Sequence, residues 1–208
     1  MTKSIRAKTA VVLVLSMAAV ALSASSVGAE IPTPGGQSEN VDGYLRFGVG
    51  LGLNSGQLEG VGPETGNIKG VSVEGAAGLT FDDRVRWDVV SLAVNLPDEV
   101  VRVGALAEHV EGTRLDMTTG IAFGDFSPDR KLHPYLSVGL GLSRYTESGY
   151  VDWGFAWNAG AGLEYQLTDT LSVGPRYTFR QGLFVYEGLD ATLNTHEFTL
   201  SVRWGSTR

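Results

Sequence analysis

Between Tyr44 and Trp204 the chain repeatedly places apolar residues at every second position. Successive side chains of a β-strand point to opposite sides, so a period of two predicts strands with one apolar face. Eight segments show it: Leu45–Leu53, Val71–Phe81, Val85–Val89, Leu115–Phe123, Leu136–Leu142, Phe155–Tyr165, Leu171–Phe179 and Phe198–Trp204. The pattern predicts an all-β protein of eight strands.

Composition excludes several other classes of protein. The chain has no Cys, which excludes disulfide scaffolds, thiol nucleophiles and Cys-ligated metal centres. Its 43% hydrophobic content is too high for a disordered chain, and its net charge of -7 argues against a nucleic-acid partner. Apart from the first stretch, the chain has no run of about 20 apolar residues, so no helical membrane span is predicted.

The first 29 residues have the layout of an export signal. Lys3, Arg6 and Lys8 precede the apolar run Ala10–Ala21, and Val27–Ala29 supplies small residues for cleavage after Ala29. An uncleaved membrane anchor is the alternative. Residues 30–41 are rich in Pro, Gly and polar side chains, which predicts a flexible periplasmic leader before a barrel over residues 42–204.

The residues opposite the apolar positions decide which face meets solvent. Many are glycines, which suit a crowded narrow interior better than a solvent-facing strand surface: Gly48, Gly50, Gly52, Gly78, Gly120, Gly139, Gly141, Gly160, Gly162 and Gly174. We therefore expect the polar face to line a lumen and the apolar face to meet lipid, as in an antiparallel up-and-down transmembrane β-barrel. A soluble periplasmic barrel with a ligand inside is the alternative.

Charged side chains of both signs share the predicted lumen face. They are Arg46, Glu74, Arg86, Asp88, Arg114, Asp116, Glu164, Arg176, Arg180, Glu197 and Arg203. Buried charges are costly unless they are paired, so we expect a satisfied network that fills a lumen only eight strands wide. The alternative is a gate whose rearrangement passes ions or small solutes, making the protein a narrow channel.

Aromatic residues gather near both ends of the apolar face. Phe81, Trp87, Phe123, Tyr165 and Trp204 lie near the short turns, and Tyr145, Trp153, Phe155, Phe179, Phe184 and Tyr186 lie near the longer loops. Two aromatic belts around an aliphatic waist are typical of the two interfaces of a membrane. The alternative is that these residues form the core of a β-sandwich.

The connections also differ between the two ends of the predicted barrel. Those near residues 82–83, 125–134 and 166–170 are short to moderate. Longer or intermediate loops are predicted at 54–67, 95–112, 146–154 and 184–195. The stretch 97–110 is treated as loop or strand extension, with a short helix as the alternative. The loops carry an acidic crown that is expected to meet an extracellular partner or divalent cations: Glu59, Glu64, Asp98, Glu99, Glu108, Glu111, Glu147, Asp152, Glu187 and Asp190.

The segments 133–141 (HPYLSVGLG) and 158–172 (NAGAGLEYQLTDTLS) resemble the small OmpA/OmpX-type outer-membrane barrel, the porin family, over residues 42–204. The resemblance implies a monomer in the outer membrane of a Gram-negative bacterium, in contact with lipid and lipopolysaccharide. It implies a structural or surface-interaction role. Members usually end on the last aromatic residue, which resembles a signal for the barrel-assembly machinery, whereas here the tail 205–208 follows Trp204. No wall-binding domain is expected after the barrel.

Catalytic chemistry is not predicted. A lipid-modifying hydrolase of the outer membrane needs a His beside a Ser and an acid, and the three histidines are scattered at His109, His133 and His196. The alternative is a hydrolase site made of His196, Glu197 and a loop Ser; otherwise His196 is a solvated His at the end of a strand. Three scattered histidines also give no metal site, and no cofactor is expected.

Overall fold

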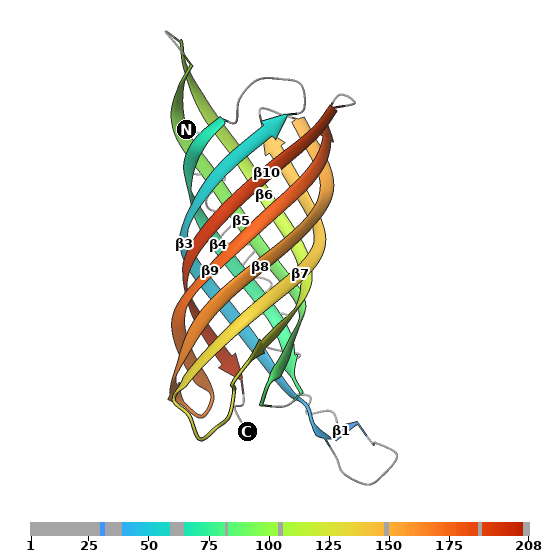
Figure 1. The fold of residues 1–208 in the computed structure, drawn as a ribbon, viewed down its shortest axis with the longest axis vertical. Helices are drawn as coiled ribbons and strands as arrows, with labels where there is room; N and C mark the ends of the chain where they lie inside the picture. The colour runs from blue at the N-terminus through green and yellow to red at the C-terminus, as the bar shows by residue number, and fades with distance from the viewer. Residues whose placement is uncertain are drawn as a thin grey trace, which may run out of the picture.

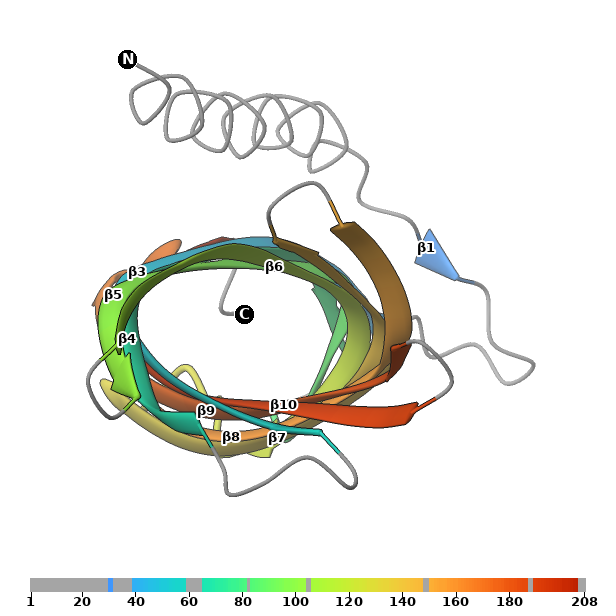
Figure 2. The ribbon, with the colours of Figure 1, turned by 90° about the horizontal axis from the view of Figure 1, so that it is seen from above.

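The computed structural model describes residues 30–31, 39–58, 65–81, 83–103, 106–147, 150–186 and 189–205. Eight strands form one closed barrel, as Figures 1 and 2 show from the side and from above. They are β3 Asp42–Leu58, β4 Thr65–Thr80, β5 Val85–Val103, β6 Leu106–Gly124, β7 Leu132–Glu147, β8 Tyr150–Thr168, β9 Leu171–Tyr186 and β10 Leu189–Gly205. The predicted fold class is confirmed.

Each strand of the barrel pairs antiparallel with its neighbour in sequence, and β10 closes the ring against β3. The closing ladder runs from Ala191 opposite Leu58 to Gly205 opposite Tyr44. The last strand thus includes Gly205, one residue beyond the predicted end of the barrel. Because the ring is closed, the barrel presents no unpaired edge along its length, which is the condition for a sheet to lie in lipid.

The predicted leader contains a small element of its own. β1 (Glu30–Ile31) pairs antiparallel with β2 (Glu39–Asn40) in a two-stranded sheet outside the barrel. The predicted signal peptide and residues 206–208 lie outside the described residues. No helix of the described part is long and apolar enough to span a membrane.

Burial is inverted relative to a water-soluble protein. On β7, Leu136 is 66% exposed and Leu140 57%, whereas Arg114, Arg180 and Arg203 on other strands are at most 2% exposed. Neighbouring positions alternate in this way around the described barrel. The apolar face therefore points outward, as the sequence predicts.

Glycines on the inner face leave room for long polar side chains. A Cβ atom on Gly48 would lie 2.8 Å from Cγ of Glu74, and one on Gly139 would lie 2.9 Å from Nδ2 of Asn158. Real Cβ atoms do not approach other atoms so closely. These glycines are therefore the space into which the buried polar side chains extend.

The strands continue well past the predicted apolar segments at the end of the barrel opposite the short turns. The predicted long loops at 54–67, 95–112, 146–154 and 184–195 are wrong over most of their length, because β3 to β10 extend into them. Backbone pairing needs no apolar side chain, so the hairpins continue where the period-two pattern stops. For 95–112 the strand extension is confirmed and the helix alternative is wrong, since β5 reaches Val103 and β6 begins at Leu106.

A β-bulge explains why the predicted segment Val85–Val89 covers only the first part of β5. Val89 and Val90 are both exposed and together lie opposite one residue of β6, Thr119. The bulge shifts the alternation by one, so that Ser91, Ala93 and Asn95 face inward beyond it.

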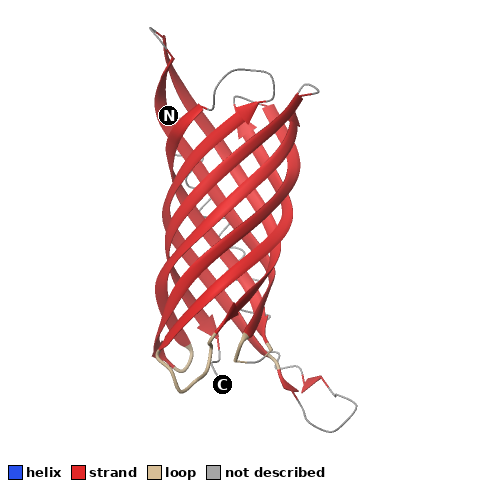
Figure 3. Ribbon diagram, in the orientation of Figure 1, coloured by secondary structure: helices blue, strands red, loops and turns tan. Residues whose placement is uncertain are grey.

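The short connections gather at one end, drawn as tan loops at the bottom of Figure 3. Phe126 in the connection between β6 and β7 folds back into the barrel, where it is 2% exposed. Its backbone N–H donates to the carbonyl of Asp83 in the neighbouring turn at 2.6 Å. This turn thereby helps to close the short-turn end of the lumen.

Candidate functional site

The lumen is the one place where the described chain concentrates polar chemistry. All eleven charged residues predicted to line it point inward and are buried. They fall into layers along the barrel, each held by ion pairs, most of which join different strands.

The layer nearest the short turns is organised around Glu164. Its Oε2 accepts from Nη1 of Arg86 at 2.7 Å and from Nε of Arg203 at 2.9 Å. Nη2 of Arg203 also donates to Ser172 Oγ at 3.0 Å. The guanidinium carbon of Arg86 lies 3.5 Å from the ring centroid of Phe126. One carboxylate therefore holds two buried arginines.

The next layer pairs Arg46 with Asp88. Nη2 of Arg46 lies 2.8 Å from Oδ2 of Asp88, and the Tyr44 hydroxyl donates to Oδ1 of the same carboxylate. Tyr135, which packs against Phe126 with ring centroids 6.2 Å apart, closes the space beside them. Tyr44 and Tyr135 have the parity of Arg46 and Ser137, so the alternation itself could have placed them in the lumen. Phe126 lies in a turn and has no such signal.

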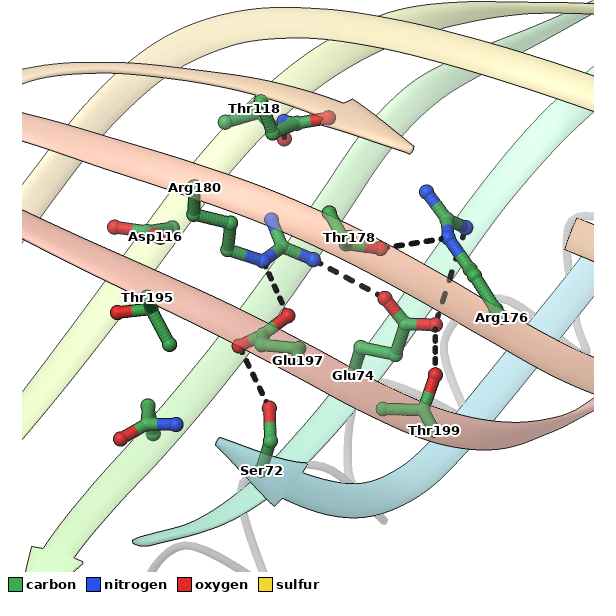
Figure 4. Close-up of polar contacts among 12 residues, drawn as sticks. Ser72, Glu74, Asp116, Thr118, Arg176, Thr178, Arg180, Thr195, Glu197 and Thr199 are labelled. Carbon is green, nitrogen blue, oxygen red and sulfur yellow. Dashed lines mark hydrogen bonds and ion pairs between the residues drawn. The ribbon is translucent and has the colours of Figure 1, made fainter. Parts of the chain in front are cut away.

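The central layer is built on Arg180, as Figure 4 shows. Its Nε donates to Glu197 Oε2 at 2.6 Å and its Nη2 to Glu74 Oε2 at 3.1 Å. Glu74 also lies 3.9 Å from Nη1 of Arg176 and accepts from the Thr199 hydroxyl, while Glu197 accepts from Ser72 at 2.7 Å. Two carboxylates and two guanidinium groups thus cross-link β4, β9 and β10.

The layer toward the long hairpins joins Arg114 to Asp116. Nε of Arg114 donates to Asp116 Oδ1 at 2.9 Å, and Nη1 donates to the Leu193 carbonyl and to Thr195. Asn54 accepts from Thr195 at 2.8 Å and donates to Asn95 at 2.9 Å. The two asparagines were not among the predicted site residues, because the prediction considered only charges.

Side chains fill the central layers closely. Seven inward residues there are each at most 2% exposed: Ser72, Glu74, Asp116, Thr178, Arg180, Thr195 and Glu197. A passage wide enough for water would leave these side chains exposed to it. The polar lumen is therefore filled by its own charged and hydroxyl-bearing side chains in this state.

The outer wall carries most of the predicted aromatic belts. Trp87, Phe123, Tyr165 and Trp204 are exposed near the short turns, where Phe81 stacks on Trp87 with centroids 6.4 Å apart. Trp153 and Phe155 are exposed toward the long hairpins. Phe179 also faces outward, edge-on to Trp157 at 5.3 Å. The side chain of Tyr186 lies outside the described ones.

Tyr145 and Phe184 do not belong to the outer belt. Tyr145 is the cross-strand partner of the buried Arg114, and paired residues point to the same side of a sheet. Phe184 is 7% exposed, and the two rings lie 6.4 Å apart inside the barrel. Strand extension beyond Leu142 continues the alternation, so Tyr145 takes the inner parity of Ser143.

The geometry also bears on the His196 and Glu197 arrangement. Glu197 points into the lumen toward Arg180, whereas His196 lies on the outer wall, where Nδ1 is 2.7 Å from the Tyr177 hydroxyl. Adjacent residues of a strand point to opposite faces, so the two side chains cannot act together. His133 is buried, with Nδ1 2.8 Å from the Asp125 carbonyl. The side chain of His109 is outside the described ones.

Metal ligation is equally unsupported in the part of the chain that the structure describes. No group of three His, Asp or Glu side chains there is arranged to hold a metal ion. Of the predicted acidic crown, Asp190 is exposed and Asp152 half-buried, and the other eight side chains lie outside the described ones.

A closed eight-stranded barrel with an apolar exterior, aromatic ends and a polar, side-chain-filled lumen defines the class of small outer-membrane barrels. Residues 9–205 match the family model for the outer membrane protein beta-barrel domain, and the chain belongs to that family. No curated protein sequence matches the chain.

Solved structures with the same fold include Neisserial surface protein A, at a TM-score of 0.59 and 15% identity over 78% of this chain and 96% of that one. OprG from Pseudomonas aeruginosa aligns with a TM-score of 0.47 and 12% identity, over 79% of this chain and 95% of that one. Ail of Yersinia pestis aligns with a TM-score of 0.42 and 14% identity, over 78% and 99%. At these identities the likeness concerns the fold.

Proposed function

We propose that this outer-membrane barrel is a non-enzymatic surface protein in which the filled lumen is structural and the long hairpins make the external contacts. The observation that carries the proposal is the β5–β6 hairpin. β5 pairs with β4 only as far as Pro97, and β6 pairs with β7 only as far as Gly112. Beyond these points, Asp98–Val103 of β5 pairs only with Leu106–Glu111 of β6.

This projecting hairpin, seen at the top of Figure 1, differs from the rest of the sheet. Along it, six residues of each strand have no outer partner among the described residues. The one-sided stretches at the same end of β4 and β8 are shorter, since the β4–β5 ladder begins at Gly70 and the β8–β9 ladder at Phe155. An unpaired strand edge is a template for another chain, which can add main-chain hydrogen bonds to it. We infer that the hairpin is the contact surface for an extracellular protein partner.

The proposal places the start of β3 and the end of β10 in the periplasm and the long hairpins outside, after cleavage behind Ala29. The chain has no Cys, so single cysteines report the orientation without background. Val101→Cys in the hairpin is expected to react with a membrane-impermeant maleimide on intact cells. Asp129→Cys, exposed in the turn between β6 and β7, is expected to react only after the outer membrane is opened. The reverse pattern would contradict the proposed orientation.

A structural lumen also predicts the absence of steady conductance. In a planar bilayer the purified barrel is expected to stay silent at moderate voltage, because its central layers leave no water-wide passage. Its folding is checked on the same sample by a heat-dependent shift on a denaturing gel. Regular single-channel steps from a preparation with a complete shift would favour the narrow-channel alternative.

A further inference from the structure

The outward-facing side of β7 changes chemical character at Arg144. Leu136, Val138, Leu140 and Leu142 occupy successive outward positions and are all exposed. The next outward position is Arg144, which is half-buried. Its guanidinium carbon lies 5.8 Å from the ring centroid of Trp153, the residue directly across the ladder on β8. A cation thus lies on an aromatic ring at the end of the apolar wall.

The height of this pair on the barrel can be estimated from the strand itself. Pro134 stands at the short-turn end of β7, and Arg144 is ten residues further along. At about 3.3 Å of rise per residue and a tilt of about 40°, ten residues span about 25 Å along the barrel axis. That is the height of the apolar band of an outer-membrane barrel. Arg144 and Trp153 therefore lie at the membrane interface on the side of the long hairpins.

The surroundings of Arg144 leave its charge available to lipid. Within the described part of the chain no carboxylate forms an ion pair with it, and its guanidinium lies against the Trp153 ring. The ring holds the planar guanidinium in place by cation–π attraction. Nε of Arg144 is buried without a hydrogen-bond partner, so the two Nη groups are the donors that can reach a lipid. A guanidinium binds phosphate oxygens by parallel hydrogen bonds, and lipid phosphates are the abundant anions at this depth.

We propose that Arg144 and Trp153 form a binding site on the outer wall for a phosphate of lipid A, the phosphorylated glycolipid of the outer leaflet. The site rests on the proposed orientation, in which the long hairpins face the cell exterior. Arg144 supplies the charge and the donors, and Trp153 fixes the guanidinium at the interface. A bound lipid stabilises the folded barrel because it binds only the folded state.

The test compares unfolding of the barrel in phosphatidylcholine vesicles with and without lipid A. The temperature at which half of the folded gel band is lost is measured for the wild type, Arg144→Gln, Trp153→Leu and Arg130→Gln. Arg130 is a matched control, since it is an exposed arginine at the opposite end of the barrel, paired with Asp125. Lipid A is expected to raise the midpoint of the wild type and of Arg130→Gln equally. Arg144→Gln is expected to lose at least half of that rise, and Trp153→Leu a smaller part.

Dephosphorylated lipid A separates the phosphate from the acyl chains. With it, the wild type is expected to behave as Arg144→Gln does with lipid A. A full rise in Arg144→Gln, or an equal rise with dephosphorylated lipid A, would overturn the site. If Arg144→Gln gives no folded band, the test rests on Trp153→Leu, and a full rise of its midpoint with lipid A would overturn the site. Failure of the proposed function would instead appear in the cysteine labelling, which uses neither residue.

Discussion

Replacing Glu164 with glutamine is expected to lower the free energy of unfolding by about 3–5 kcal/mol, because it leaves buried guanidinium groups without their counter-charge. Glu164 is the shared partner of Arg86 and Arg203. Glutamine keeps the shape of the side chain, so packing is nearly unchanged and the loss reports charge. Urea unfolding in vesicles, followed by tryptophan fluorescence, measures the change.

The control for Glu164 is an ion pair at the barrel surface. Asp125 lies 2.7 Å from Arg130, and both side chains are more than a third exposed. Asp125→Asn should cost no more than about 1 kcal/mol, since water screens an exposed pair. Replacing Arg86, Glu164 and Arg203 together by Met, Leu and Met should recover much of the stability lost in Glu164→Gln. A loss below 1 kcal/mol for Glu164→Gln would show that water, not packing, surrounds this layer.

An arginine in place of Leu140 is expected to cost about 2–4 kcal/mol of unfolding free energy, because it puts a charge at the middle of the lipid-facing wall. Leu140 is 57% exposed and lies between Pro134 and Arg144 on the outward side of β7. In a soluble protein the same change at so exposed a position would have almost no effect. Urea titration of the refolded barrel in vesicles, with the fraction folded read from the gel shift, measures it.

The comparison variant for Leu140 is Asp129→Arg. Asp129 is exposed in the connection between β6 and β7, outside the apolar band. Adding a positive charge there is expected to change stability by less than about 0.5 kcal/mol. Equal stability of Leu140→Arg and the wild type would mean that the apolar wall does not face lipid. The soluble-barrel alternative would then have to be reconsidered.

The sequence pattern predicts which residues line the lumen but not which of them form ion pairs with one another. The alternation puts Glu164, Arg203 and Arg86 on the polar face of their strands. The many glycines on that face indicate that it points into the narrow interior of the barrel. Which carboxylate meets which guanidinium does not follow, because Arg86 and Glu164 are 78 residues apart and meet across the lumen. That pairing depends on the register of the whole closed ring, to which every hairpin contributes.

Register also accounts for the errors at the ends of the strands. The predicted segments stop where apolar side chains stop, near Val89 and Leu142, but backbone hydrogen bonds continue. Strand pairing determines both the bulge at Val89 and Val90 and the strand extension that points Tyr145 inward. The spacing of hydrophobic residues carries no information about either feature.

The sequence by itself determined the local part of this protein: eight strands, an apolar outer face, a charged inner face and hence a barrel in lipid. These follow from the period of two, because each side chain's direction depends only on its own position along a strand. The tertiary structure alone decided the ion-pair partners, the inward turn of Phe126 and the projecting β5–β6 hairpin. It also brought Arg144 onto Trp153. Each of these depends on which strands lie side by side and in what register, a property of the closed ring as a whole.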